Sequence, residues 1–187
     1  MIPRDLTFVL GGARSGKSLH AEQLASGSAR PVIYIATARI ADAEFAERVA
    51  HHRQRRPAHW QLHEAPLDLA GALAQADAPG RCILIDCLTL WLANLLCPPA
   101  SPASPDTAPS PGDHLARFAA LEQALKSAAA KVIVVSNEIG LGVVPLGAAT
   151  REYVDELGRL NQRIAALSTE ATLMVAGLPL ALKSAGH

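Results

Sequence analysis

A phosphate-binding sequence, GGARSGKS, lies near the start of the chain and matches the pattern G-x-x-x-x-G-K-[ST] between an apolar run and a helical pattern. Glycines let backbone N–H groups turn inward toward phosphate oxygens, and the start of the helix adds partial positive charge. In such a loop Lys17 reaches the β- and γ-phosphates, and the hydroxyl of Ser18 binds Mg²⁺. The sequence therefore predicts a site for a magnesium-bound nucleoside triphosphate. The residues of this expected loop are Gly11, Gly12, Ala13, Arg14, Ser15, Gly16, Lys17 and Ser18.

An acidic residue at the end of another apolar run could complete the nucleotide site. The run CILIDC places Asp86 directly after four apolar residues, where a strand would end. A carboxylate there can orient Mg²⁺ or its bound water, so Ser18 and Asp86 are the expected metal-binding residues. Asp86 also precedes the helical pattern at 87–97, and a strand-terminal aspartate could instead cap that helix. The two motifs predict a nucleotide-binding protein without distinguishing a kinase from a GTPase switch or an ATPase.

The stretch AHHRQRRPAHW carries two adjacent histidines. The pattern predicts an amphipathic helix at 41–56 that ends before the proline. On this helix His52 shares the apolar face of Phe45 and Val49, whereas His51 points away from it. Adjacent side chains on a helix do not converge, which argues against a zinc site made of both histidines. His52 is therefore either a half-buried core histidine or a nucleophile toward the phosphorus of a bound nucleotide.

Three arginines follow the histidines and make this stretch basic. The whole chain carries 17 Lys and Arg against 17 Asp and Glu, so its formal net charge is zero. Binding to a polyanion such as nucleic acid needs a clear basic excess, so the stretch should serve something small and local. Arg53, Arg55 and Arg56 could neutralise triphosphate charge, or they could be a solvated helix end that complements the helix dipole.

Apolar runs rich in Val, Ile and Leu are typical of strands buried on both faces of a parallel sheet. They alternate with helical patterns, which predicts an α/β fold in one domain, residues 1–187, with a mostly parallel sheet flanked by helices. The expected strands are 6–11, 32–37, 82–87, 131–137 and 172–177, with a short edge strand at 60–66. The expected helices are 17–27, 41–56, 66–77, 87–97, 113–130 and 148–169. The segment 97–113 is dense in Pro, Ser and Ala, so it is expected to be a flexible, exposed loop.

Three cysteines, Cys82, Cys87 and Cys97, are present, and none forms a CxxC pair. Cys82 and Cys87 flank an apolar run and are expected to be small core residues rather than disulfide partners. The chain starts close to a strand, so no signal peptide is expected, and no apolar run approaches the ~20 residues of a membrane span. A reducing, cytoplasmic location fits these observations.

Six motifs in a fixed order carry a resemblance to a known family: GGARSGKS, YIATA, DAEFAERVAHHRQRRPAHW, IDCLTLWLANLL, SNEIGLGVVP and GRLNQRIA. From Leu6 to Lys183 the chain resembles the bifunctional adenosylcobinamide kinase / adenosylcobinamide-phosphate guanylyltransferases of cobalamin biosynthesis. The resemblance implies a RecA-like P-loop fold in a homotrimer. It also implies that the chain phosphorylates adenosylcobinamide with ATP or GTP. GMP from GTP would then pass through a histidine to adenosylcobinamide phosphate, giving adenosylcobinamide-GDP.

The resemblance also implies roles for particular residues. The guanylylated histidine of the family is the second of the HH pair, which is His52 here and agrees with the helical face. Some members carry Glu in place of Asp86, and the shorter side chain could alter how the metal or nucleotide is held. Besides the P-loop, the implied nucleotide-binding residues are Thr37, Ala38, Arg39, Arg53, Gln54, Arg55, Arg56, Glu64 and Asp86.

The residues after the fourth strand are expected to border the cobinamide site, because ligands bind at the carboxyl ends of strands in open α/β sheets. These are Asn137, Glu138 and residues 140–145. Glu138 could be the general base of the kinase step, or its carboxylate could brace the loop. Exposed apolar residues within 87–97 are candidates for the contact between subunits.

Two other functions remain open. A non-catalytic GTP-binding regulatory module would use the same P-loop, and its histidines and arginines would face a partner protein. A kinase-only relative acting on another small alcohol would bind nucleotide but would not attach GMP to itself. A GMP-sized adduct after incubation with GTP and Mg²⁺ would separate the bifunctional enzyme from both.

Overall fold

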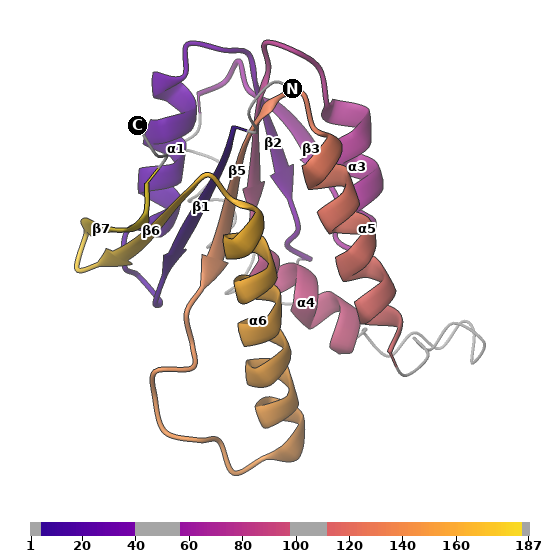
Figure 1. Cartoon of the computed structure of the whole chain (residues 1–187), viewed down its shortest axis with the longest axis vertical. Helices are drawn as coiled ribbons and strands as arrows, with labels where there is room; N and C mark the ends of the chain where they lie inside the picture. Colours follow the sequence, from indigo (N-terminus) through magenta and orange to yellow (C-terminus); the bar gives the residue numbers. More distant parts are fainter. Residues whose placement is uncertain (1–4, 40–56, 98–111, 185–187) are drawn as a thin grey trace.

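The computed structural model describes residues 5–39, 57–97 and 112–184, which form one seven-stranded sheet with helices on both faces (Figure 1). The strands are β1 (Leu6–Gly11), β2 (Val32–Ala36), β3 (Gln61–Glu64), β4 (Cys82–Asp86), β5 (Lys131–Asn137), β6 (Glu170–Val175) and β7 (Leu178–Lys183). The helices are α1 (Lys17–Gly27), α3 (Leu69–Ala76), α4 (Leu88–Leu96), α5 (Asp113–Ser127) and α6 (Ala148–Leu167). None of these helices is long and apolar enough to cross a membrane.

The strand order is β3-β2-β4-β5-β1-β6-β7. All neighbouring pairs are parallel except β6 and β7. The carboxyl ends of six strands, including β1, β4 and β5, therefore meet at one edge of the sheet, which is the lower edge in Figure 1. The predicted fold class, a RecA-like P-loop domain with a mostly parallel sheet between helices, is confirmed.

The sheet is buried on both faces, which explains why its strands are almost continuously apolar. On one face Phe8 and Ile35 pack with Trp91, in a core shared with α3, α4, α5 and α6. On the other face Val9 and Val135 pack against α1. The nitrogen Nε1 of Trp91 donates a hydrogen bond to the carbonyl oxygen of Leu67 at 2.9 Å, so the largest buried side chain has its polar atom satisfied.

The β6–β7 hairpin differs from the sequence prediction, which placed one strand at 172–177 and none after it. The chain turns at Ala176 and Gly177, both with positive φ, of 52° and 81°. Two such residues form the tight turn that joins antiparallel strands, so β6 ends at Val175 and β7 begins at Leu178. All six residues of β7 are exposed, and the strand therefore lacks the buried apolar pattern that identified the others.

The suggestion that apolar residues within 87–97 form a subunit contact is wrong for the largest of them. Leu88, Trp91, Leu92 and Leu95 are buried in the core of this chain. Most of the exposed large apolar side chains among the described residues lie elsewhere, on β7 and in the loop between β5 and α6. By contrast, the prediction that Cys82 and Cys87 are core residues is confirmed, because both are buried free thiols.

Candidate functional site

The P-loop connects β1 to α1 at the carboxyl edge of the sheet (Figure 1). Arg14 and Gly16 adopt left-handed backbone conformations, with φ of 56° and 93°, and these turn the chain back on itself. Gly16 is the N-cap of α1 and supplies no side-chain cap, and the first turn holds no acidic residue. The N–H groups at the start of α1 are therefore suited to an anion, as the motif predicted. Ser18 lies in this first turn and is half-buried.

Lys17 lies across the P-loop. Its Nζ donates a hydrogen bond to the carbonyl oxygen of Gly12 at 3.1 Å. Burial lowers the pKa of Lys17 below its ordinary value, while Cys87 and Asp86 oppose that shift. The opposing charge interaction places the side chains of Lys17 and Asp86 near each other. A cation held in partly desolvated surroundings gains most when an anion such as a phosphate binds beside it.

Asp86 ends β4, where the sequence placed it, and its carboxylate has a defined partner. The hydroxyl of Tyr34 donates to Oδ2 of Asp86 at 2.8 Å. The helix-cap alternative does not hold, because the N-cap of α4 is Cys87 and no side chain caps that helix. Leu84 faces α1, and side chains alternate along a strand, so Asp86 lies on the face where the P-loop opens. Tyr34 was not identified from the sequence, since it reads as an ordinary apolar strand residue.

Thr37 and Glu64 lie along the same edge as Asp86. Thr37 is fully buried, and its hydroxyl donates to the carbonyl oxygen of Cys87 at 2.7 Å and accepts from the N–H of Cys87 at 3.0 Å. The Thr37 side chain therefore fixes the backbone directly after Asp86. Ala36 pairs with both Glu64 and Asp86 in the register of the sheet, so two strand spacings, roughly 10 Å, separate the Cα atoms of these two acidic residues. Ala38 and Arg39 follow Thr37 and are half-buried.

The expected nucleophile and the arginine group lie outside the described residues. These are His52, Arg53, Gln54, Arg55 and Arg56. Their places in the site, and that of the helix predicted at 41–56, stay predictions. The structure brings together the P-loop, Lys17 and Asp86, and it places Thr37 directly after β2, the neighbour of β4, and Glu64 at the end of β3.

Two backbone contacts that support the P-loop could not be found from the sequence. The N–H of Gly177, in the β6–β7 turn, donates to the carbonyl oxygen of Ser15 at 3.0 Å, and the N–H of Glu138 donates to that of Gly11 at 3.2 Å. The carboxylate of Glu138 accepts from the N–H of Gly140 at 2.7 Å, which matches its expected alternative role as a loop brace. The P-loop is thus held from both neighbouring strands.

Gly16→Ala is expected to weaken nucleotide binding at least about tenfold, whereas Gly12→Ala should change it little. A side chain on Gly16 would be strained at φ 93°, and its Cβ would lie 3.3 Å from Cα of Gly177. No other atom lies within 4 Å of a Cβ built on Gly12, which makes it the matched control. Titration calorimetry with GTP and Mg²⁺ would measure both affinities. Equal affinities for the two variants would contradict the geometry of the P-loop.

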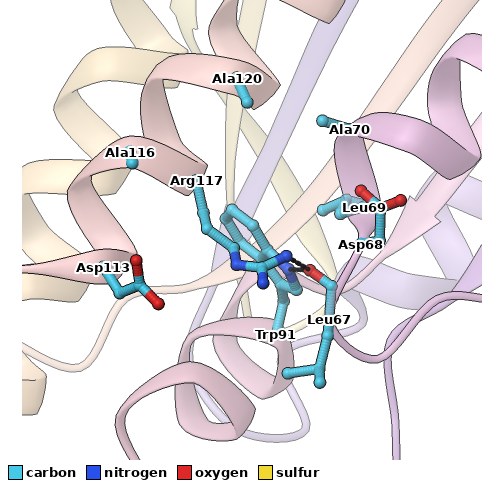
Figure 2. A pocket seen from close by; sticks show the side chains of 9 residues that line it. All are labelled: Leu67, Asp68, Leu69, Ala70, Trp91, Asp113, Ala116, Arg117 and Ala120. Carbon is cyan, nitrogen blue, oxygen red and sulfur yellow. Dashed lines mark hydrogen bonds between the residues drawn. The ribbon is translucent and has the colours of Figure 1, made fainter. Parts of the chain in front are cut away.

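A hollow of about 280 Å³ lies between α3, α4 and α5, away from the P-loop (Figure 2). Arg117 and Trp91 both donate to the carbonyl oxygen of Leu67, and the carboxylate of Asp68 accepts from the N–H of Gly71. These polar groups in the lining of the hollow are therefore already hydrogen-bonded within the protein. The hollow lies on the sheet face opposite α1 and is not part of the nucleotide site.

Comparison with known proteins places the chain among nucleotide-using enzymes, in agreement with the P-loop site. A family model described as cobinamide kinase / cobinamide phosphate guanyltransferase matches residues 7–182. The chain is 51% identical over 180 residues to the bifunctional adenosylcobalamin biosynthesis protein CobP of Pseudomonas aeruginosa, covering 96% of this chain and 97% of that one. It is 39% identical over 185 residues to the bifunctional adenosylcobalamin biosynthesis protein CobU of Salmonella typhimurium, covering 95% and 99%.

A solved structure of a distant protein has a similar fold. It is protein PH0250 of Pyrococcus horikoshii OT3, with a TM-score of 0.57 and 8% identity, covering 97% of this chain and 87% of that one. At this identity the likeness concerns the fold alone. The family match spans nearly the whole chain and includes the P-loop and Asp86. The chain therefore belongs to the cobinamide kinase / cobinamide phosphate guanyltransferase family of enzymes.

Proposed function

We propose that this enzyme phosphorylates adenosylcobinamide with ATP or GTP and then transfers GMP from GTP, through a guanylylated histidine, to adenosylcobinamide phosphate. The product is adenosylcobinamide-GDP, and one domain, residues 1–187, carries both reactions. The observation that carries the proposal is the P-loop with Lys17 and Asp86 beside it, in a chain that matches this family over residues 7–182. The resemblance also supports a cytoplasmic homotrimer that acts on small molecules.

The donor atoms beside the P-loop suit Mg²⁺. The hydroxyl of Ser18 and the carboxylate of Asp86 are hard oxygen ligands of the kind this ion prefers. Mg²⁺ is usually held by one or two protein ligands together with the phosphates of its substrate, so Ser18 and Asp86 would be sufficient for an ion that arrives with the triphosphate. Bound there, Mg²⁺ would neutralise negative charge on the β- and γ-phosphates.

In the kinase step the protein positions the reactants and supplies charge. The N–H groups of the P-loop hold the phosphates, and Lys17 offsets the negative charge that develops on the departing nucleoside diphosphate. The substrate hydroxyl attacks the γ-phosphorus in line with the leaving oxygen. No protein nucleophile is needed, so the step depends on positioning.

In the guanylyl step His52 attacks the α-phosphorus of GTP. A phosphorus–nitrogen bond forms, and the bond to pyrophosphate breaks with its electron pair on the leaving group. Arg53, Arg55 and Arg56 offset charge on the α-phosphate and on pyrophosphate. A phosphate oxygen of adenosylcobinamide phosphate then attacks the same phosphorus and releases His52. The covalent intermediate lets pyrophosphate leave before the second bulky substrate enters.

The acceptor is proposed to bind along the loop between β5 and α6. Leu141, Val143 and Leu146 are 85%, 95% and 98% exposed, and Ile139 and Val144 are exposed as well. The loop starts at Glu138, whose N–H is bonded to the first residue of the P-loop. A loop that carries several exposed apolar side chains and starts at a phosphate site suits a substrate with a large ring and a reacting hydroxyl.

Intact-mass measurement after incubation with GTP and Mg²⁺ tests the proposal. The expected result is an adduct of the mass of GMP, together with phosphorylation of adenosylcobinamide when ATP or GTP is supplied. A GTP-binding regulatory module would give neither product. A kinase-only enzyme would phosphorylate an alcohol and give no adduct, so either of these results would refute the bifunctional assignment.

A further inference from the structure

Asn137 lies between the two halves of the nucleotide site. It ends β5, the strand between β1 and β4, and it pairs with Gly11, the first residue of the P-loop. Val135 packs on the α1 face, so Asn137, two residues further along, faces the same side. Asp86 faces this side from β4. Asn137 is thus placed between the P-loop and the Asp86 carboxylate.

Hydrogen bonds fix the backbone of Asn137, whereas its side-chain oxygen has no hydrogen-bond partner among the described residues. Its N–H donates to Oγ1 of Thr89 at 2.9 Å, and its carbonyl oxygen accepts from Nδ2 of Asn161 at 3.0 Å. Its side-chain oxygen Oδ1 is buried and has no hydrogen-bond partner among the residues that the structure describes. A buried acceptor without a partner is costly in a native protein, and such a group often meets its partner only when a ligand binds.

We infer that the side-chain amide of Asn137 holds the acceptor hydroxyl during the phosphoryl transfer, an inference that rests on the proposed function. The P-loop, where the phosphates are proposed to bind, starts beside Asn137 at Gly11, and the apolar loop 139–146 begins two residues after Asn137. The attacking hydroxyl has to lie between these two regions. A rotation about χ1 that carries the whole amide toward the bound phosphates lets Oδ1 accept the hydrogen of that hydroxyl and gain the partner it lacks.

The transfer of the γ-phosphoryl group to the acceptor hydroxyl needs no basic group of the protein. The hydroxyl oxygen forms a bond to the γ-phosphorus, and the bond to the bridging oxygen breaks with its electron pair on the nucleoside diphosphate. The hydroxyl proton passes to a phosphoryl oxygen of the product. The amide of Asn137 neither gains nor loses a proton, since it only orients the attacking oxygen.

Asn137→Ala tests this role in the full-length enzyme with ATP, Mg²⁺ and adenosylcobinamide. The expected result is about a 100-fold lower kcat for phosphorylation with an unchanged KM for ATP. Slow ATP hydrolysis in the absence of adenosylcobinamide should stay at the wild-type rate, because it uses no substrate hydroxyl. Covalent attachment of GMP should also be unchanged, because it occurs at the α-phosphorus.

Ser136→Ala is the matched control, because Oγ of Ser136 is also buried without a hydrogen-bond partner in the described structure but faces the opposite side of the sheet. This variant should keep both reactions. If Asn137→Ala does not fold, as judged by loss of GMP attachment and of the thermal transition, Asn137→Ser replaces it with the same expected rates. The inference would be overturned if Asn137→Ala lost ATP hydrolysis and phosphorylation of adenosylcobinamide to the same extent. It would also be overturned if this variant phosphorylated adenosylcobinamide at the wild-type rate. Absence of phosphorylation by the wild-type enzyme would instead refute the proposed function.

Discussion

Replacing His52 by alanine should abolish the attachment of GMP to the protein while leaving phosphorylation of adenosylcobinamide within about tenfold of the wild-type rate. The covalent step needs a nitrogen nucleophile, which alanine does not supply, so labelling should fall at least about a thousandfold. We expect the kinase step to depend on the P-loop and Lys17, whose residues this substitution leaves unchanged. Radiolabelled GTP followed by acid treatment measures the phosphoramidate, because its phosphorus–nitrogen bond is labile in acid.

His51→Ala is the control for this experiment. The helical pattern directs His51 away from the face shared by Phe45, Val49 and His52, so its loss should leave labelling intact. Acid-labile label on the His52→Ala protein would show that another residue is the nucleophile. Loss of label from His51→Ala with normal labelling of His52→Ala would show that the helical face was assigned the wrong way round.

The parallel part of the fold could be predicted because burial on both faces leaves a strong signal in the sequence. β1, β4 and β5 coincide with their apolar runs to within one residue. β7 could not be predicted in this way, because all of its residues are exposed and its apolar side chains do not pack into the core. The turn at Ala176 and Gly177 depends on two positive φ angles, and the sequence shows only one glycine there.

In the nucleotide site, too, some residues could be predicted from the sequence and others could not. The P-loop and Asp86 were predicted because their chemistry demands particular residue types at fixed places relative to a strand and a helix. Tyr34, which hydrogen-bonds Asp86, and Thr37, which holds the backbone of Cys87, are contributions of tertiary structure. Their partners are about fifty residues away, and nothing in the local pattern indicates such contacts. Residues that do chemistry were therefore easier to find than those that position them.

Lys17→Ala is expected to reduce both reactions at least about a thousandfold, since each uses a triphosphate held by the same loop. The ligand-free fold should lose no stability. Burial lowers the pKa of Lys17, so its charged form is less favourable in the folded protein than in the unfolded chain. That unfavourable contribution is present at neutral pH and fades as the pH rises through the lowered pKa toward the ordinary value of 10.5. Alanine removes it at every pH, so thermal unfolding without nucleotide should occur at or above the wild-type temperature.

Two measurements distinguish the effect of the positive charge of Lys17 from the effect of its side-chain volume: proton uptake on binding GTP, and the activity of a variant of similar volume. Phosphates beside Lys17 raise its pKa again, so the wild-type protein should take up protons on binding GTP at pH values between the lowered pKa and 10.5. Calorimetry in two buffers of different ionisation enthalpy measures this uptake, which Lys17→Ala should lack. Lys17→Met, which keeps most of the side-chain volume, should behave like Lys17→Ala in both reactions. If Lys17→Met kept either reaction at the wild-type rate, the ammonium group would not be what stabilises the phosphates in that reaction, and the shared P-loop mechanism would fail for it.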